Sequence, residues 1–187
     1  FACFHLPPPN ATTRQTYWAL FQMMAASARR VVPGAAVHLI TSDTAQVPGG
    51  LDHDAVCRYP AGHSVEQSFT RLKVEEVMGW RTYLASPLFT LPTVLVDADL
   101  LIQQDPEPLF DGSFDLGLTF TSDPGLHAIN TGVIFADPTN REPVLEFFDQ
   151  TRAAIEKVSP DLQAWLGDQE AVDQVLGNPE ITDRDDG

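Results

Sequence analysis

The chain has 187 residues, of which 43% are hydrophobic, and its formal net charge is −15. This length and hydrophobic content predict a single domain over residues 1–187, with room for further chain at either end. The acidic excess repels polyphosphate and argues against nucleic acid as a partner, because such binding depends on Lys and Arg. A small phosphorylated ligand held by a metal ion stays compatible with this charge.

The location of the protein is inferred from what the sequence lacks. No run approaches the roughly 18 apolar residues of a membrane span, and the opening segment has no basic leader typical of a signal peptide. We therefore expect a cytoplasmic protein, or one in the lumen of the secretory pathway if an anchor precedes this segment. Cys3 and Cys57 do not form a disulfide framework and are predicted to be unpaired core residues.

The chain alternates short apolar strands with helices. Helical spacing of apolar residues predicts helices over residues 13–30, 68–84 and 142–157, and a last helix that begins near Asp168. Strands are predicted for residues 1–6, 36–40, 56–59, 93–96, 116–120 and 131–135. This alternation predicts an α/β fold with a mainly parallel sheet and helices on both faces.

Two carboxylates, Asp97 and Asp99, directly follow the apolar strand 93–96 in the segment VLVDADLL. Ligands of open α/β sheets bind at the carboxyl ends of strands, and residues i and i+2 of an extended segment point the same way. Two hard oxygen ligands close together attract Mn²⁺ or Mg²⁺, which keeps positions open for phosphate oxygens. The pair therefore predicts a metal site, with capping or a solvated turn as the alternative.

Four segments in order resemble the nucleotide-diphospho-sugar glycosyltransferases of the GT-A fold. They are SFTRLKVEEVM (68–78), TVLVDADLLI (93–102), INTGVIFAD (129–137) and GDQEAVDQVL (167–176). The resemblance is closest to the family-8 type, which includes bacterial lipopolysaccharide galactosyl- and glucosyltransferases and glycogenin. It implies a Rossmann-like GT-A fold and a hexosyltransferase that moves a sugar from a nucleotide-diphosphate sugar, most simply a UDP-sugar, to a sugar or other hydroxyl acceptor.

The resemblance also implies roles for residues of the first two motifs. Asp97 and Asp99 of the DxD motif would hold Mn²⁺ or Mg²⁺ on the donor diphosphate, and Asp97 would also contact the donor. Arg71 would reach the diphosphate or the donor sugar, where a guanidinium can take two oxygens. A solvated helix cation is the alternative for Arg71. Lys73, two residues further on, is expected to face elsewhere on the helix.

The last two motifs supply the sugar-binding and catalytic candidates. Asn130 and Thr131 are expected to bind the donor sugar, with Gly132 allowing close approach of the ligand. The alternative role for Asn130 is a structural one, in which it closes a turn. In the family, the Asp that matches Asp168 contacts the donor sugar, and the Gln that matches Gln169 lies near its anomeric carbon. Asp168 is alternatively a helix N-cap. The stereochemistry of transfer, retaining or inverting, stays open.

Two departures from the family pattern concern the nucleoside and the metal. The resemblance implies that Leu6 and Thr41 lie where this fold cradles the nucleoside. The family usually offers an acidic or small polar residue near the first strand, and the segment LPPPN departs from that pattern, which leaves the specificity for uracil open. The family's third metal ligand is a His near the carboxyl end, and no His follows His127 in this sequence. Either a later part of the chain supplies the ligand, or the Asp pair, phosphate and water complete the site.

Two other functions compete with a transferase. A haloacid-dehalogenase-like phosphatase also places Asp-x-Asp after an apolar strand and could recruit Lys157 and Asp185-Asp186. About ninety residues precede the pair here, whereas that motif opens its domain. The missing His also leaves open a non-catalytic or incomplete domain that binds a sugar nucleotide.

Overall fold

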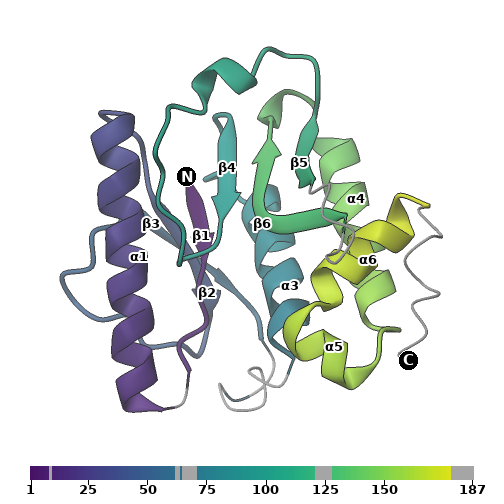
Figure 1. The fold of residues 1–187 in the computed structure, drawn as a ribbon, viewed down its shortest axis with the longest axis horizontal. Helices are drawn as coiled ribbons and strands as arrows, with labels where there is room; N and C mark the ends of the chain where they lie inside the picture. The colour runs from purple at the N-terminus through teal and green to yellow at the C-terminus, as the bar shows by residue number, and fades with distance from the viewer. Residues whose placement is uncertain (9, 62–63, 65–70, 121–127, 178–187) are drawn as a thin grey trace.

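The computed structural model describes residues 1–8, 10–61, 64, 71–120 and 128–177, and its core is one six-stranded sheet (Figure 1). The strands are β1 (Ala2–Phe4), β2 (His38–Ser42), β3 (Ala55–Tyr59), β4 (Thr93–Val96), β5 (Leu116–Phe120) and β6 (Ile129–Ala136). Their order across the sheet is β3-β2-β1-β4-β6-β5. The first four strands in this order run parallel, and β6 runs antiparallel to both β4 and β5.

The antiparallel strand β6 determines what lies beside the end of β4. Val96, the last residue of β4, pairs with Val133, and the Asp97 N–H donates to the Gly132 carbonyl at 3.0 Å. The amino end of β6 therefore meets the carboxyl end of β4. This arrangement brings the Asn-Thr-Gly segment beside the Asp pair, although more than thirty residues separate them in the chain.

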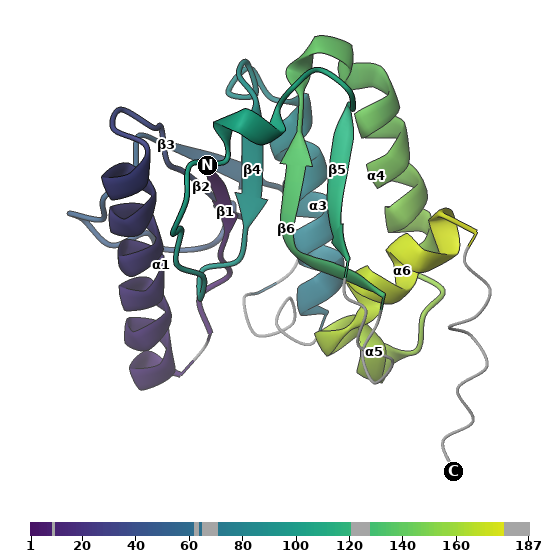
Figure 2. The same ribbon diagram turned by 45° about the horizontal axis from the view of Figure 1, so that its top comes forward.

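Helices cover both faces of the sheet, as predicted. The helix α1 (Ala11–Val31) lies on one face, and α3 (Leu72–Ala85) and α4 (Arg141–Ile155) lie on the other (Figures 1 and 2). The alternation of side chains along each strand explains the two cores. Cys3 of β1 packs on the α1 side, whereas its neighbours Ala2 and Phe4 pack on the α3 side.

Two short helices complete the α3 side. Figure 2 shows α5 (Pro160–Trp165) and α6 (Gly167–Val175) beside the lower end of α3, and both pack against it. The sequence analysis predicted α6 but not α5, because six residues are too few to show helical periodicity.

The helix boundaries differ from the predictions for local reasons. The helix α1 begins at Ala11 because the Asn10 side chain accepts hydrogen bonds from the Thr12 and Thr13 N–H groups, at 2.9 and 3.2 Å. The helix α3 is described from Leu72, so residues 68–70 of its predicted start lie outside the described part of the chain.

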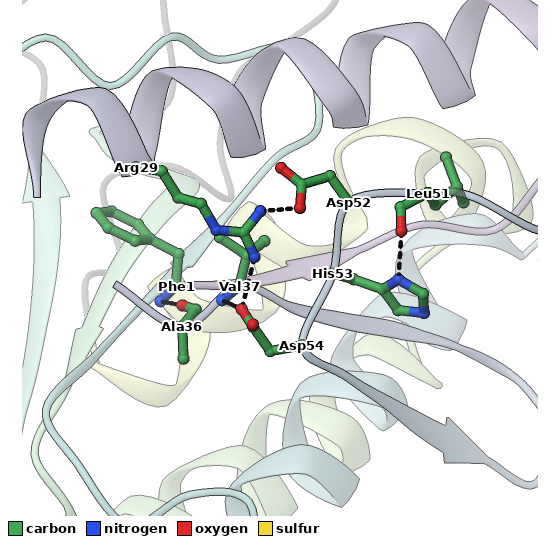
Figure 3. A network of polar contacts seen from close by, with 8 residues as sticks. All are labelled: Phe1, Arg29, Ala36, Val37, Leu51, Asp52, His53 and Asp54. Carbon is green, nitrogen blue, oxygen red and sulfur yellow. Dashed lines mark hydrogen bonds and ion pairs between the residues drawn. The ribbon is translucent and has the colours of Figure 1, made fainter. Parts of the chain in front are cut away.

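A polar network joins the end of α1 to the starts of β2 and β3 (Figure 3). Arg29 pairs with Asp52 and, at 2.6 Å, with Asp54. The same oxygen of Asp54, Oδ2, also accepts the Val37 N–H at 2.7 Å. The Val37 N–H and the Arg29 guanidinium lower the pKa of Asp54. The network lies at the end of the sheet opposite the Asp pair, and its role is structural.

The described helices and the two cysteines bear on the expectations about membrane spans and disulfides. No helix in the described ranges is long and apolar enough to cross a membrane. Cys3 and Cys57 are buried and form no disulfide, which confirms the prediction of unpaired core residues. Burial raises the pKa of both thiols, so neither is a reactive thiolate at neutral pH.

Candidate active site

A cavity of about 240 Å³ lies at the carboxyl ends of β1 and β4, between α1 on one side and α3, α5 and α6 on the other. Two of its walls differ in character. Near β1 the wall is aromatic and apolar, with His5, Leu6 and Tyr17. Near β4 the wall is charged. The polar residues of this second wall are Lys73, Glu76, Asp97, Asp99 and Gln169.

Asp97 and Asp99 both line the cavity, with Asp97 half-buried and Asp99 exposed. The carboxylate of Asp97 lies against Gly132: a Cβ placed on Gly132 would be 3.0 Å from Asp97 Oδ2. Gly132 is therefore needed to make room for this carboxylate. The space at Gly132 was expected from the sequence to admit the ligand, and it is occupied by the Asp97 carboxylate instead. Burial raises the pKa of Asp97, an effect that Lys73 opposes and that Asp168 and Asp99 reinforce.

Lys73 is the cation of this site, whereas its spacing from Arg71 predicted that it faces elsewhere on the helix. Its Nζ donates to Glu76 Oε2 at 2.7 Å and lies 3.3 Å from Asp168 Oδ2. Burial alone would lower the pKa of Lys73, but Glu76, Asp168 and Asp97 together raise it. Burial likewise raises the pKa of Glu76. The Lys-x-x-Glu spacing in the first turn of α3 is the signal that could have identified the pair.

Asp168 is fully buried in the first turn of α6. Its Oδ2 accepts the Thr131 hydroxyl at 2.5 Å, and its Oδ1 has no hydrogen-bond partner among the described residues. The N-cap of α6 is Leu166, so the alternative role of Asp168 as an N-cap is wrong. Thr131 and Lys73 both contact the same oxygen of Asp168, Oδ2, and the next residue, Gln169, lines the cavity.

The remaining candidates are spread over the site and beyond it. Leu6 is buried and lines the cavity. Arg71 precedes α3, Asn130 is exposed and Thr41 is buried on β2, and none of these three lines the cavity. The Asn130 side chain instead accepts the Gly132 N–H at 2.8 Å, a local hydrogen bond within β6.

His5 is a second residue of the site that the sequence motifs did not indicate. It is buried at the cavity wall, and its ring centroid lies 4.2 Å from that of Trp18 and 5.8 Å from that of Tyr17. Its Nε2 has no hydrogen-bond partner among the described residues. Burial lowers the pKa of His5 to about 4, so the ring is neutral at physiological pH.

The chemistry of the donors suits a hard divalent cation. Lys73 is the one Lys or Arg among the described residues that line the cavity. It interacts with three carboxylates, those of Glu76, Asp97 and Asp168, and a fourth, Asp99, lies close enough to Asp97 to affect its pKa. A bound Mn²⁺ or Mg²⁺ would compensate the excess negative charge of these carboxylates. The described residues contain no group of three or more His, Cys, Asp or Glu side chains placed to hold a metal. Substrate oxygens or water would therefore have to complete the coordination.

No family model and no curated protein matches this chain. Three solved structures similar in fold are glycosyltransferases. The galactosyltransferase LgtC, solved with donor and acceptor sugar analogs, is 14% identical over 89% of this chain and 69% of LgtC, with a TM-score of 0.51. GlyE of Streptococcus pneumoniae is 15% identical over 95% of this chain and 43% of GlyE, with a TM-score of 0.54. The bifunctional WbbM is 10% identical over 93% of this chain and 36% of WbbM, with a TM-score of 0.53.

These similarities define the class of fold. The chain has the GT-A fold of glycosyltransferases, and LgtC-like enzymes are among its structural neighbours. The prediction of this fold from four short motifs is confirmed. The chain spans less than half the length of GlyE and of WbbM, and identities of this size establish the fold rather than the reaction.

Proposed function

We propose that this domain transfers a sugar from a nucleotide-diphosphate sugar, most simply a UDP-sugar, to an acceptor hydroxyl with the help of Mn²⁺ or Mg²⁺. The observation that supports the proposal best is the cavity at the end of β4. It unites Asp97 and Asp99 with Gln169, next to the buried Asp168, in a domain with the fold of sugar-transferring enzymes.

Asp97 and Asp99 would hold the metal ion. When bound, the ion neutralises the charge that builds on the leaving nucleoside diphosphate. The protein positions the carboxylates. The backbone hydrogen bond from Asp97 N–H to the Gly132 carbonyl fixes the end of β4, and the missing side chain of Gly132 leaves room for the Asp97 side chain. Arg71 is proposed to reach the diphosphate from the start of α3, and Asn130 to meet the sugar from the start of β6.

Gln169 and Asp168 are proposed as the residues of the reaction centre. A neutral amide is a poor nucleophile, so Gln169 is assigned to orienting the donor and stabilising charge near the anomeric carbon. Asp168 would accept a donor-sugar hydroxyl through Oδ1, the oxygen that no described residue engages. Because Asp168 is fully buried and does not line the cavity, this contact would require an opening next to Gln169. Thr131 would act through its bond to the other oxygen.

The opposite wall is proposed to receive the nucleoside. Leu6 and Tyr17 offer apolar surface, and the neutral His5 adds no charge. Thr41 lies behind this wall on β2, and a direct contact with the ligand would require an opening next to it.

A binding-only domain is the second candidate. The observation that favours it is the pair of carboxylates without a third protein ligand in the described ranges. The phosphatase alternative receives less support, because Lys157 is exposed and does not line the cavity that contains Asp97.

Turnover of a panel of nucleotide sugars with Mn²⁺, measured as release of the nucleoside diphosphate with and without sugar acceptors, tests the proposal. The wild type should hydrolyse or transfer at least one donor. Gln169→Ala should lower kcat by about 10²-fold, as for loss of one group that stabilises transition-state charge. Donor binding without turnover of any donor would favour the binding-only domain. Rapid release of phosphate from a phosphomonoester would contradict the transferase.

A further inference from the structure

Trp165 differs from the other two tryptophans of the chain in its exposure. Trp18 and Trp80 are 6% and 1% exposed, whereas Trp165 is 69% exposed. It is the last residue of α5, two residues before α6 begins, and it lines the cavity that contains the Asp pair. Packing among the described residues therefore does not account for this indole.

The surroundings of Trp165 combine apolar and polar surface. Leu72 and Leu166, both half-buried, continue the apolar wall next to it. Asp99 and Gln169 line the same cavity and present a carboxylate and an amide. An exposed apolar surface with a few converging polar groups is typical of a ligand site.

We propose that Trp165 is the stacking platform for a saccharide ring at this site. A pyranose has an apolar face of C–H groups and a rim of hydroxyls. The flat indole matches the apolar face, while the Asp99 carboxylate and the Gln169 amide can bond the hydroxyls. The inference rests on the proposed sugar transfer and adds where the ring lies: over Trp165, beside Gln169.

The ring could belong to the donor or to the acceptor, because both carry the same C–H face. A nucleobase is a different ligand, and the site favours it less at Trp165. A base would find its apolar surface on the opposite wall at Leu6 and Tyr17, away from Asp99 and Gln169. The experiment therefore has to separate the saccharide from the base, and then the donor from the acceptor.

Fluorescence titration of Trp165 makes the first separation. The wild type and Trp165→Phe are titrated, in buffer with Mn²⁺, with UDP, UDP-galactose, UDP-glucose, methyl β-galactoside and methyl α-glucoside. Subtracting the Trp165→Phe signal leaves the emission of Trp165, since Trp18 and Trp80 remain in both proteins. A change with a UDP-sugar that exceeds the change with UDP, or a change with a methyl glycoside, supports the platform. An equal change with UDP alone would overturn it.

Kinetics then identify the source of the ring. Trp165→Ala should raise the KM of one saccharide about tenfold, the loss expected for about 1.4 kcal/mol of apolar contact. The KM of the same saccharide for Trp165→Phe should stay within about threefold of the wild-type value, because phenylalanine keeps an aromatic face. A raised donor KM in hydrolysis without acceptor assigns the ring to the donor, and a raised acceptor KM assigns it to the acceptor. Leu109→Ala, 55% exposed and outside the cavity, is the matched control.

The result that overturns the platform is distinct from failure of the proposed function. If UDP-sugars bind by calorimetry and neither saccharide KM nor Trp165 emission changes, the platform is wrong and sugar-nucleotide binding stands. If no UDP-sugar binds the wild type, the proposed donor class is wrong, and the methyl glycoside titration still tests Trp165 by itself.

Discussion

Lys73 Nζ lies 3.3 Å from Asp168 Oδ2, which ties the first turn of α3 to the first turn of α6 across nearly a hundred residues of chain. The same ammonium group donates to Glu76 at 2.7 Å. Both carboxylates are almost completely buried, so Lys73 compensates charge that water does not reach. The position of the proposed catalytic segment therefore depends on a residue on another helix.

Removal of the Lys73 charge should affect stability and activity together. Lys73→Met leaves Glu76 and Asp168 buried without their cation, which should lower the free energy of unfolding by about 3 kcal/mol at neutral pH. Turnover should fall in the protein that remains folded. Urea unfolding and donor turnover at low temperature measure the two effects. Lys157→Met, which changes an exposed lysine, is the control, and a Lys73→Met variant that matches it in both measurements would contradict this role.

Because the space beside Gly132 is small, a side chain at this position should selectively weaken metal-dependent binding of UDP. In Gly132→Ala, the new Cβ would lie 3.0 Å from Asp97 Oδ2 and 3.0 Å from Asn130 Oδ1, so the Asp97 carboxylate must move. Binding of UDP in the presence of Mn²⁺ should weaken by about tenfold, as for loss of a group that orients a metal ligand. Gly49→Ala, which meets no atom within 4 Å, should bind normally. Equal affinities of the two variants would argue against a constrained Asp97.

The buried His5 predicts a loss of stability in acid. Its pKa is lowered from 6.5 to about 4 in the folded protein, so the unfolded chain binds the proton first as the pH falls. The stability linked to His5 is constant above about pH 6.5 and is lost between pH 6.5 and 4, by up to about 3 kcal/mol. Urea unfolding at pH 7, 5.5 and 4.5 should show that the free energy of unfolding falls more steeply with decreasing pH for the wild type than for His5→Gln. Parallel curves would show that His5 is not buried as a neutral ring.

Close packing between α3 and β1 predicts the sign of a substitution at Gly79. A Cβ at this position would lie 2.7 Å from the ring of Phe4, a buried residue that also lines the cavity. Ala replaces Gly in a helix interior with a gain of about 1 kcal/mol, and overpacking costs about 1–3 kcal/mol. Gly79→Ala should therefore lower the melting temperature. A higher melting temperature would mean that the Phe4 ring moves aside at little cost.

Much of the fold could be predicted from the sequence because its signals are local. The run of apolar residues in β4 and the spacing of α1 and α4 predict these elements directly. The Asp pair could be placed at a strand end for the same reason. The start of α1 was predicted two residues late, because the Asn10 cap precedes the first apolar position of the helix.

The parts of the site that could not be predicted depend on tertiary contacts. The direction of Lys73 is set by where α3 meets α6, and spacing along one helix does not contain that information. The pairing of Thr131 with Asp168 likewise needs β6 to run antiparallel to β4. Trp165 is on a helix of six residues, too short for a periodic signal, and its exposure depends on what packs around it.

The most direct test of the central claim is calorimetry of UDP binding with Mn²⁺ and with a chelator. The wild type should bind UDP at least about tenfold more tightly with Mn²⁺, a difference of about 1.4 kcal/mol. Asp97→Asn and Asp99→Asn should lose that difference, whereas Asp105→Asn, which changes an exposed carboxylate of the loop after β4, should keep it. UDP binding that is equal with Mn²⁺ and with chelator, or a Mn²⁺ effect that survives both substitutions, would contradict the assignment of the Asp pair.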